Sequence, residues 1–66
     1  MKNNLKVQRA IFNLTQADLA DKIKVSRQTI NAMEAGKYVP STVLALKISL
    51  VFNKPVNELF FLEPED

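Results

Sequence analysis

Apolar residues recur three and four positions apart along much of this chain, which is the spacing of one face of an α-helix. In one stretch the apolar face is formed by Leu19, Ala20 and Ile23, and in the next by Ile30 and Met33. Only a short connection separates the two stretches. The pattern therefore predicts two short amphipathic helices in close succession.

Residues that cap helices stand at the expected ends of both helices. Thr15 and Asp18 form a near capping box, in which a hydroxyl and an acidic side chain three positions later bond the first free N–H groups. Ser26 is the corresponding cap of the next helix, and Gly36 is the kind of residue that follows a helix end. We therefore expect the helices to run from Thr15 to about Ile23 and from Ser26 to Gly36.

Three further helices are predicted on either side of this pair. The first runs from about Asn4 to Phe12, the fourth follows the capping residue Ser41 from Thr42 to about Phe52, and the fifth is a short turn or helix over residues 56–60. The fourth is apolar on all sides, which is typical of a helix that is central in its domain or covered by a partner. The chain is therefore predicted to be all-α, a compact five-helix bundle.

The connection between the second and third helices has the spacing of a helix-turn-helix. Ala20 is small, which allows two helices joined by a short turn to cross at a steep angle. Val25 is the apolar residue of the turn, and Ile30 and Met33 follow as inward residues of the next helix. A small residue, an apolar turn and two inward residues at this spacing predict a helix-turn-helix.

The polar face of the third predicted helix carries Arg27, Gln28 and Asn31. A long cation and two amides are the side chains that read base edges in the major groove of DNA. An ordinary solvated face is the competing interpretation of this group. The helix-turn-helix spacing around it favours base reading.

Composition excludes most other kinds of site. The chain has 66 residues, enough for one small domain, with no cysteine, no histidine and one glycine. This excludes a disulfide framework, a thiolate or histidine metal site and a Gly-rich phosphate loop, so we expect no catalysis, no cofactor, no metal and no small-molecule substrate. No apolar run reaches the ~18–20 residues of a membrane span. The first ten residues do not resemble a signal peptide, so we expect a cytoplasmic protein with no membrane attachment.

Charge is spread unevenly along the chain. The acidic tail of residues 63–66 carries three of the seven carboxylates, so residues 1–62 hold nine cations against four anions, a net charge of +5 compared with +2 for the whole chain. A basic domain is compatible with a polyanionic partner. A mildly basic surface without such a partner explains the same charge equally well.

The stretch LTQADLADKIKVSRQTINAMEAGKYVPS resembles the helix-turn-helix of the phage Cro and repressor family, often called the XRE family. The likeness runs from Leu5 to about Leu62. It implies a lambda repressor-like DNA-binding domain over residues 1–62, followed by the tail of residues 63–66. In this family the third helix enters the major groove of double-stranded DNA and the second lies across the backbone. The implied function is sequence-specific DNA binding that regulates transcription, with repression as the expected outcome.

The resemblance also implies which residues contact DNA. Arg27 is expected to hydrogen-bond guanine, and Gln28 or Asn31 to hydrogen-bond adenine. The methyl group of Ala32 is expected to contact the thymine methyl. Phosphate contacts are expected at the start of the second helix, at the start of the third and in the loop that follows, from Gln16, Ser26, Thr29, Lys37, Tyr38 and Ser41.

Arg9 and Glu34 match a pair that forms an internal ion pair in repressor-type members, and we expect it to tie the first helix to the third. Two positions depart from the family pattern, because Lys24 and Asn13 stand where glycine is usual. A lysine in the left-handed conformation costs roughly 1 kcal/mol and an asparagine less, so the fold is still expected.

Four large apolar residues near the end of the chain, Leu59, Phe60, Phe61 and Leu62, cannot all face one small core. The exposed part of this cluster is a candidate dimer interface. A homodimer suits DNA binding, because one recognition helix covers about half a site and a twofold dimer binds the two halves of a palindromic operator, roughly 10 base pairs apart.

Two alternatives to this function remain. The first is an antitoxin-like interaction module, in which the C-terminal cluster binds a protein partner and DNA binding is secondary. The second is RNA binding, which is disfavoured because Tyr38 is the one candidate for stacking on a base.

Overall fold

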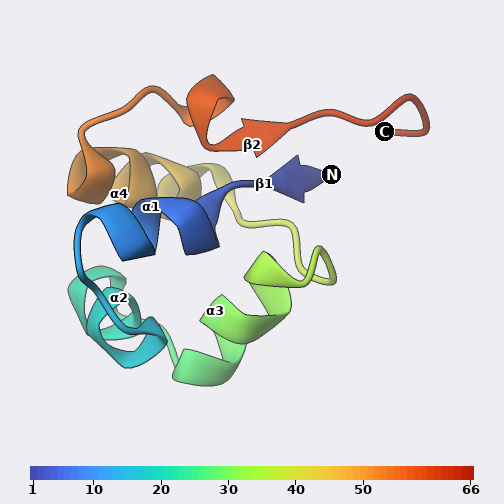
Figure 1. Ribbon diagram of the computed structural model, residues 1–66. Helices are drawn as coiled ribbons and strands as arrows, with labels where there is room; N and C mark the ends of the chain where they lie inside the picture. The colour runs from blue at the N-terminus through green and yellow to red at the C-terminus, as the bar shows by residue number, and fades with distance from the viewer.

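The computed structural model describes residues 1–66 and consists mainly of four α-helices around one core (Figure 1). The helices are α1 (Leu5–Ile11), α2 (Gln16–Ile23), α3 (Arg27–Glu34) and α4 (Thr42–Phe52), followed by the 3-10 turn η1 (Val56–Glu58). Two short antiparallel strands, β1 (Lys2–Asn3) and β2 (Phe60–Phe61), bring the two ends of the chain together. The four long helices lie where the hydrophobic pattern predicts them, with ends that differ by one or two residues.

The predicted caps account for where the helices begin. The backbone N–H of Asp18 donates to the Thr15 hydroxyl at 3.0 Å, and the N–H of Thr15 donates to the Asp18 carboxylate at 2.9 Å, which completes the capping box. The hydroxyls of Ser26 and Ser41 accept from backbone N–H groups three residues on, at 3.2 and 3.1 Å. These bonds satisfy N–H groups that have no partner inside the helix, so local sequence fixes three of the four starts.

The prediction of a fifth helix is wrong. After Pro55 the chain makes only the single 3-10 turn of η1 and then extends into β2. Backbone groups at this point bond to the start of the chain: the N–H of Asn4 donates to the carbonyl oxygen of Leu59 at 3.1 Å, and Asn3 lies opposite Phe60 in the register of the two strands. The aromatic residues of β2 also favour a strand. The fold is therefore mainly helical, with four helices, one 3-10 turn and a two-stranded sheet, rather than a five-helix bundle.

All four helices and the C-terminal segment contribute to one core. Its eleven buried apolar side chains are Leu5, Leu19, Ala20, Ile23, Ile30, Met33, Leu44, Ile48, Phe52, Leu59 and Phe60. Every predicted inward residue of α2 and α3 is among them. Burial of a large apolar side chain contributes roughly 1.5–3 kcal/mol, so the inner face of α3 is firmly anchored.

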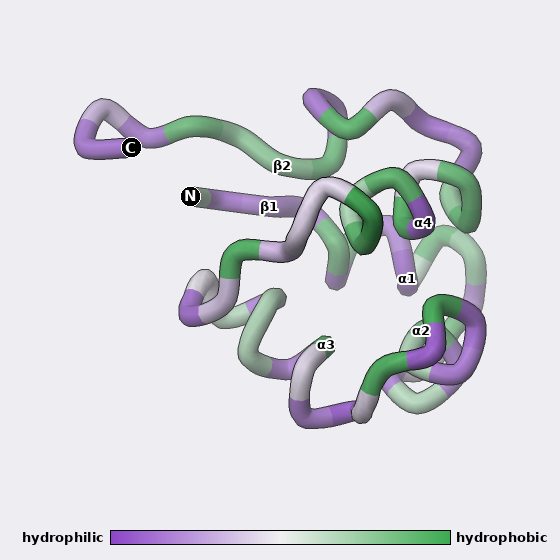
Figure 2. Tube along the Cα trace, turned by 180° about the vertical axis from the view of Figure 1, so that it is seen from behind, coloured by the Kyte–Doolittle hydropathy of each residue, from purple (hydrophilic) through white to green (hydrophobic).

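Helix α4 has one face in this core and one face in solvent. The exposed face carries Val43, Leu46 and Leu50, and the hydropathy colouring in Figure 2 shows long apolar stretches along α4. Apolar side chains thus lie on both the buried and the exposed sides of α4, as the sequence predicts, with Lys47 as the charged residue of the helix. Because no other part of the chain covers the outer side, α4 leaves an apolar face on the surface.

Candidate nucleic-acid interface

Helices α2 and α3 are joined by a tight turn that holds α3 at the lower edge of the molecule (Figure 1). Lys24 adopts the left-handed conformation, with φ of 61°, and the N–H of Val25 donates to the carbonyl oxygen of Ala20 at 3.0 Å. Ala20 itself is buried. Its small side chain permits the close approach of the two helices that the sequence pattern predicts.

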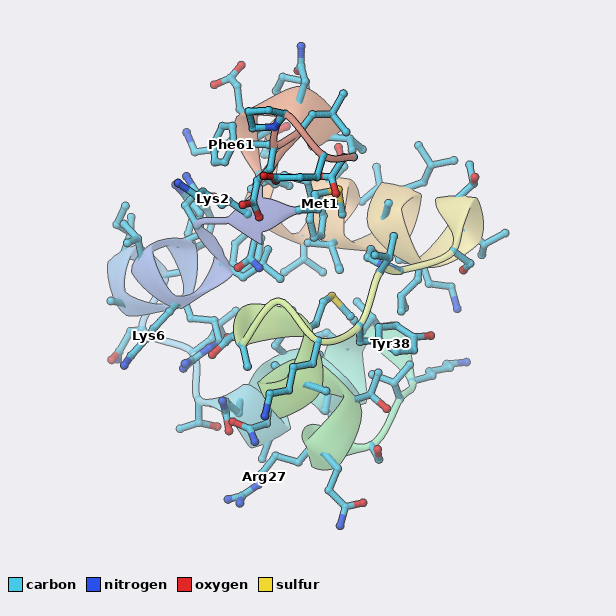
Figure 3. All side chains as sticks on the ribbon, turned by 90° about the vertical axis from the view of Figure 1, so that its right-hand side faces the viewer. Met1, Lys2, Lys6, Arg27, Tyr38 and Phe61 are labelled. Carbon is cyan, nitrogen blue, oxygen red and sulfur yellow. The ribbon has the colours of Figure 1, made fainter.

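Arg27, Gln28 and Asn31 lie on the exposed face of α3, opposite its buried residues. Figure 3 shows the Arg27 side chain extending away from the body of the protein. Ala32, the fourth predicted base contact, is half-buried at the flank of this face. The exposed face therefore presents one guanidinium and two amides, which are the groups that form paired hydrogen bonds with base edges.

Most residues expected to contact phosphates surround α3. The hydroxyls of Ser26 and Thr29 are bonded to each other at 3.0 Å at the start of α3, and that of Ser41 caps α4. Lys37 and Tyr38 are exposed in the loop between α3 and α4, with Tyr38 at the side of the molecule in Figure 3. Two hydroxyls thus lie at the start of α3, and a cation and a phenol follow its end, whereas Ser41 lies farther along the chain at the start of α4. Such groups donate hydrogen bonds to phosphate.

Gln16 differs from the rest of the phosphate set, because its side chain is bonded within the protein. Its Nε2 donates to Glu34 Oε1 at 3.1 Å and to Asn31 Oδ1 at 3.4 Å. Spacing rules relate residues on one helix, so they do not indicate this contact between α2 and α3. The only signal in the sequence is the presence of an amide and a carboxylate on two helices that must cross.

Glu34 also binds Arg9 of α1. Arg9 Nε lies 2.5 Å from Glu34 Oε2, Nη2 lies 3.0 Å from Oε1, and Nη1 donates to the carbonyl oxygen of Leu14 at 3.0 Å. Burial by itself raises the pKa of Glu34, but hydrogen bonds from Arg9 and Gln16 and the charge of Arg9 outweigh it, so the pKa lies below its ordinary value. The two side chains are 13% and 8% exposed, so this ionised pair ties α1 to the last turn of α3 just beneath the surface.

A comparison with known protein families identifies the family of this chain. A family model described as Helix-turn-helix matches residues 5–59, most of the chain. The chain belongs to this helix-turn-helix family of Cro- and repressor-type transcriptional regulators. As a family member it is a DNA-binding transcriptional regulator, and the family is not enzymatic.

Individual relatives match the helix-turn-helix regulator from end to end. It is 53% identical to the uncharacterized HTH-type transcriptional regulator MJ0272 of Methanocaldococcus jannaschii and 46% identical to the uncharacterized HTH-type transcriptional regulator YgzD of Bacillus subtilis, over all of both chains in each case. An uncharacterized HTH-type transcriptional regulator of Archaeoglobus fulgidus is 44% identical over the whole of this chain and 93% of its own. None of the helices is both long and apolar enough to cross a membrane.

The C-terminal apolar residues of the helix-turn-helix regulator divide into two pairs. Leu59 and Phe60 are buried in the core, so neither is on the surface that a second copy could contact. Phe61 is 41% exposed and Leu62 is 82% exposed. Successive side chains of a strand point to opposite faces, which is why Phe60 and Phe61 differ. The predicted dimer interface is therefore narrowed to Phe61 and Leu62.

Proposed function

We propose that this regulator recognises a specific duplex sequence by placing α3 in the major groove, and that it represses transcription as a homodimer on a palindromic operator. The observation that carries the proposal is the exposed pair Arg27 and Gln28, on the first turn of a helix whose other face is anchored in the core. Arg27 suits the N7 and O6 atoms of guanine, and Gln28 suits the N6 and N7 atoms of adenine. The half-buried methyl group of Ala32 suits a thymine methyl at the edge of the contact.

Groups at the two ends of α3 suit the phosphates on either side of the groove. Lys37, Tyr38 and Ser41 follow α3, whereas Ser26 and Thr29 open it. Their donors set the depth and register of the helix in the groove without selecting a sequence. Because the side chain of Gln16 is bonded inside the protein, the start of α2 contributes its free backbone N–H groups instead.

We expect a homodimer because one copy of α3 contacts only a short length of DNA. A single α3 covers about half a site, and a twofold pair reads two half-sites roughly 10 base pairs apart. The exposed Phe61 and Leu62 supply apolar surface for such a pair. Phe61 lies at the end of the molecule away from Arg27 in Figure 3, so a second copy bound there does not cover α3. Reading two half-sites also requires that the twofold axis leave both α3 helices on one side of the dimer.

Selection of binding sites from a random duplex library tests the proposal. The wild-type protein is expected to enrich a short palindrome, and the double variant Arg27→Ala, Gln28→Ala is expected to lose it. A matched double variant at exposed positions of α4 and η1, Lys47→Ala and Asn57→Ala, should enrich the wild-type sequence. If the wild type binds all duplexes alike in a salt-sensitive manner, sequence recognition is wrong. Enrichment of a lone half-site contradicts the homodimer.

Repression requires a separate measurement. The selected site is placed across a promoter, and transcript is measured in a purified transcription reaction with increasing amounts of the protein. Transcript should fall with the wild type and stay constant with the Arg27→Ala, Gln28→Ala variant. A rise in transcript contradicts repression.

The exposed apolar face of α4 supports a second candidate, an antitoxin-like module that binds a protein partner. Val43, Leu46 and Leu50 form a helical stripe that no other part of the chain covers. Recovery of one partner in fixed stoichiometry, together with failure of the duplex selection, supports this candidate over sequence recognition.

A further inference from the structure

The residues expected to contact phosphates carry their positive charge on one flank of α3. Lys37 is the one cation among them, and it lies with Tyr38 in the loop that follows α3. On the flank beside α1 the group has Gln16, whose side-chain NH₂ group is bonded to Glu34 inside the protein. Phosphates line both sides of a groove in duplex DNA, so a contact that is charged on one flank alone matches only half of its surroundings.

Lys6 of α1 is an exposed cation on this second flank. Figure 3 shows its side chain on one side of α3 and that of Tyr38 on the other, at similar heights, with Arg27 below both. The same figure shows Lys2 higher up, toward Phe61. Of the two lysines near the start of the chain, Lys6 is therefore the one that lies beside α3.

The charge of Lys6 reaches the last turn of α3 but is not bound there. Burial raises the pKa of Glu34, whereas hydrogen bonds and the charges of Arg9 and Lys6 lower it. Arg9 binds this carboxylate through two bonds, and Lys6 forms no ion pair. No acidic residue lies on α1 itself. The ammonium group of Lys6 is therefore close to α3 and free to bind an anion from outside the protein.

We infer that Lys6 binds a phosphate on the DNA strand opposite to the one that Lys37 contacts, so that α1 and the loop after α3 contact the two walls of the major groove. The inference rests on the proposed placement of α3 in that groove. The walls of the groove are the backbones of the two strands, so cations on opposite flanks of α3 face one strand each. A lysine ammonium carries three rotatable donors on a flexible stem, which suits a phosphate.

Lys6 is a positioning residue in this arrangement, because a phosphate contact carries no sequence information. Attraction to one wall alone draws α3 toward that wall. Attraction to both walls holds α3 between them, with the first turn of the helix directed at the base edges. The sequence pattern gives no signal for this role, since a lysine on the outer side of a first helix is also typical of an ordinary solvated surface.

The salt dependence of binding to the selected duplex gives the first test. Lys6→Met should weaken binding roughly fivefold to tenfold per bound copy at about 0.1 M salt and lower the salt slope by about 1 per copy, because one phosphate contact contributes a slope of about 0.9. Lys6→Arg keeps the charge and should bind like the wild type. Lys2→Met is the matched control at an exposed position farther from Arg27, and it should change neither quantity.

Replacement of single phosphates by uncharged methylphosphonates then identifies the strand that each cation contacts. At the phosphate bound by Lys6, the replacement should weaken binding of the wild type and have no further effect on Lys6→Met. Lys37→Met should lose its sensitivity in the same way at a phosphate on the other strand. A variant that is merely less stable stays sensitive at every contacted phosphate, so this readout separates a contact from a structural effect.

The outcomes separate this inference from the proposed function. If no duplex sequence is selected, the proposed function fails and the inference fails with it. If a sequence is selected but Lys6→Met stays sensitive at every phosphate, the inference alone is overturned. The same conclusion follows if the phosphates assigned to Lys6 and Lys37 lie on one strand, or if Lys2→Met gives the same result as Lys6→Met.

Discussion

Asn3 of β1 donates a hydrogen bond from Nδ2 to the carbonyl oxygen of Met33 in the last turn of α3, at 2.9 Å across thirty residues of sequence. The Oδ1 atom of the same side chain accepts the backbone N–H of Leu5 at 3.2 Å. One amide thus joins the first strand, the start of α1 and the end of α3. The small sheet is therefore part of what holds α3 in place.

Replacement Asn3→Ala is expected to lower the free energy of unfolding by about 1–2 kcal/mol, because the carbonyl of Met33 and the N–H of Leu5 both lose a partner. Urea denaturation followed by circular dichroism measures the change. Lys2→Ala, at the exposed neighbouring position of the same strand, should change stability by less than about 0.5 kcal/mol. Equal effects of the two variants contradict a special role of Asn3.

The four helices can be predicted from the sequence because their signals are local. These signals are the capping box of Thr15 and Asp18, the caps Ser26 and Ser41, and the three- and four-residue spacing of apolar positions. Each acts within a few residues of the chain. The two-residue strands have no periodicity to detect, and their pairing joins opposite ends of the sequence. The sequence of residues 56–60 is compatible with a helix, and the extended backbone there is explained by its pairing with the start of the chain.

In the candidate site, too, features set within one helix can be predicted from the sequence, whereas contacts between helices cannot. The outward direction of Arg27 and Gln28 follows from the inward direction of their neighbours on one helix. The bonds of Gln16 depend on how α2 crosses α3, and no spacing along the chain fixes that. The Arg9 and Glu34 pair was expected only from resemblance to a family.

Replacement Lys24→Gly is expected to stabilise the protein by about 0.5 kcal/mol. Lysine at φ 61° pays a steric cost of roughly 1 kcal/mol that glycine avoids, and the greater freedom of glycine in the unfolded chain offsets part of the gain. Asn13, at φ 56°, is the matched comparison, since asparagine tolerates this region. Thermal and urea unfolding of Asn13→Gly should show a change near zero, and an equal gain there contradicts the steric explanation.

The ion pair of Arg9 and Glu34 should make stability depend on pH in acid. The pKa of Glu34 is lowered in the folded state from an ordinary 4.5, so its contribution is present above that value and is lost as pH falls through the lowered one. Glu34→Gln should be about 2–3 kcal/mol less stable than the wild type at pH 7, because Arg9 loses its partner in a nearly buried place. The gap between the two proteins should narrow as pH falls toward 3.

Urea unfolding at a series of pH values measures this gap. Asp21→Asn, at an exposed position of α2, is the control and should follow the wild type throughout. Acid should still destabilise Glu34→Gln to a lesser degree, since the hydrogen bond from the N–H of Thr15 also lowers the pKa of Asp18. A gap that stays constant from pH 7 to 3 contradicts the role of Glu34.

Lys37 and Arg27 should affect DNA binding in different ways. Lys37→Ala is expected to weaken binding to the selected site and to unrelated duplexes alike and to lower the salt slope by about 1, as loss of one phosphate contact does. Arg27→Ala should cost about 1–3 kcal/mol on the selected site and relax preference at one base pair. Fluorescence anisotropy at several salt concentrations separates the two, with Lys47→Ala in α4 as the control. A uniform loss with Arg27→Ala places that residue on the backbone instead.

The exposed C-terminal pair should control association. Leu62→Ser removes a side chain that is 82% exposed in one copy, so the stability of the monomer should change by less than about 0.5 kcal/mol.

If Leu62 is buried between two copies, the substitution removes one buried leucine side chain from each copy of the dimer. Burial of one such side chain is worth about 1.5–3 kcal/mol. Sedimentation equilibrium should then show association weakened at least tenfold, with the dissociation constant of the dimer raised by that factor. Ile11→Ser, at an exposed apolar position of α1, is the control and should associate as the wild type does. If Leu46→Ser dissociates the protein and Leu62→Ser does not, the outer face of α4 is the interface.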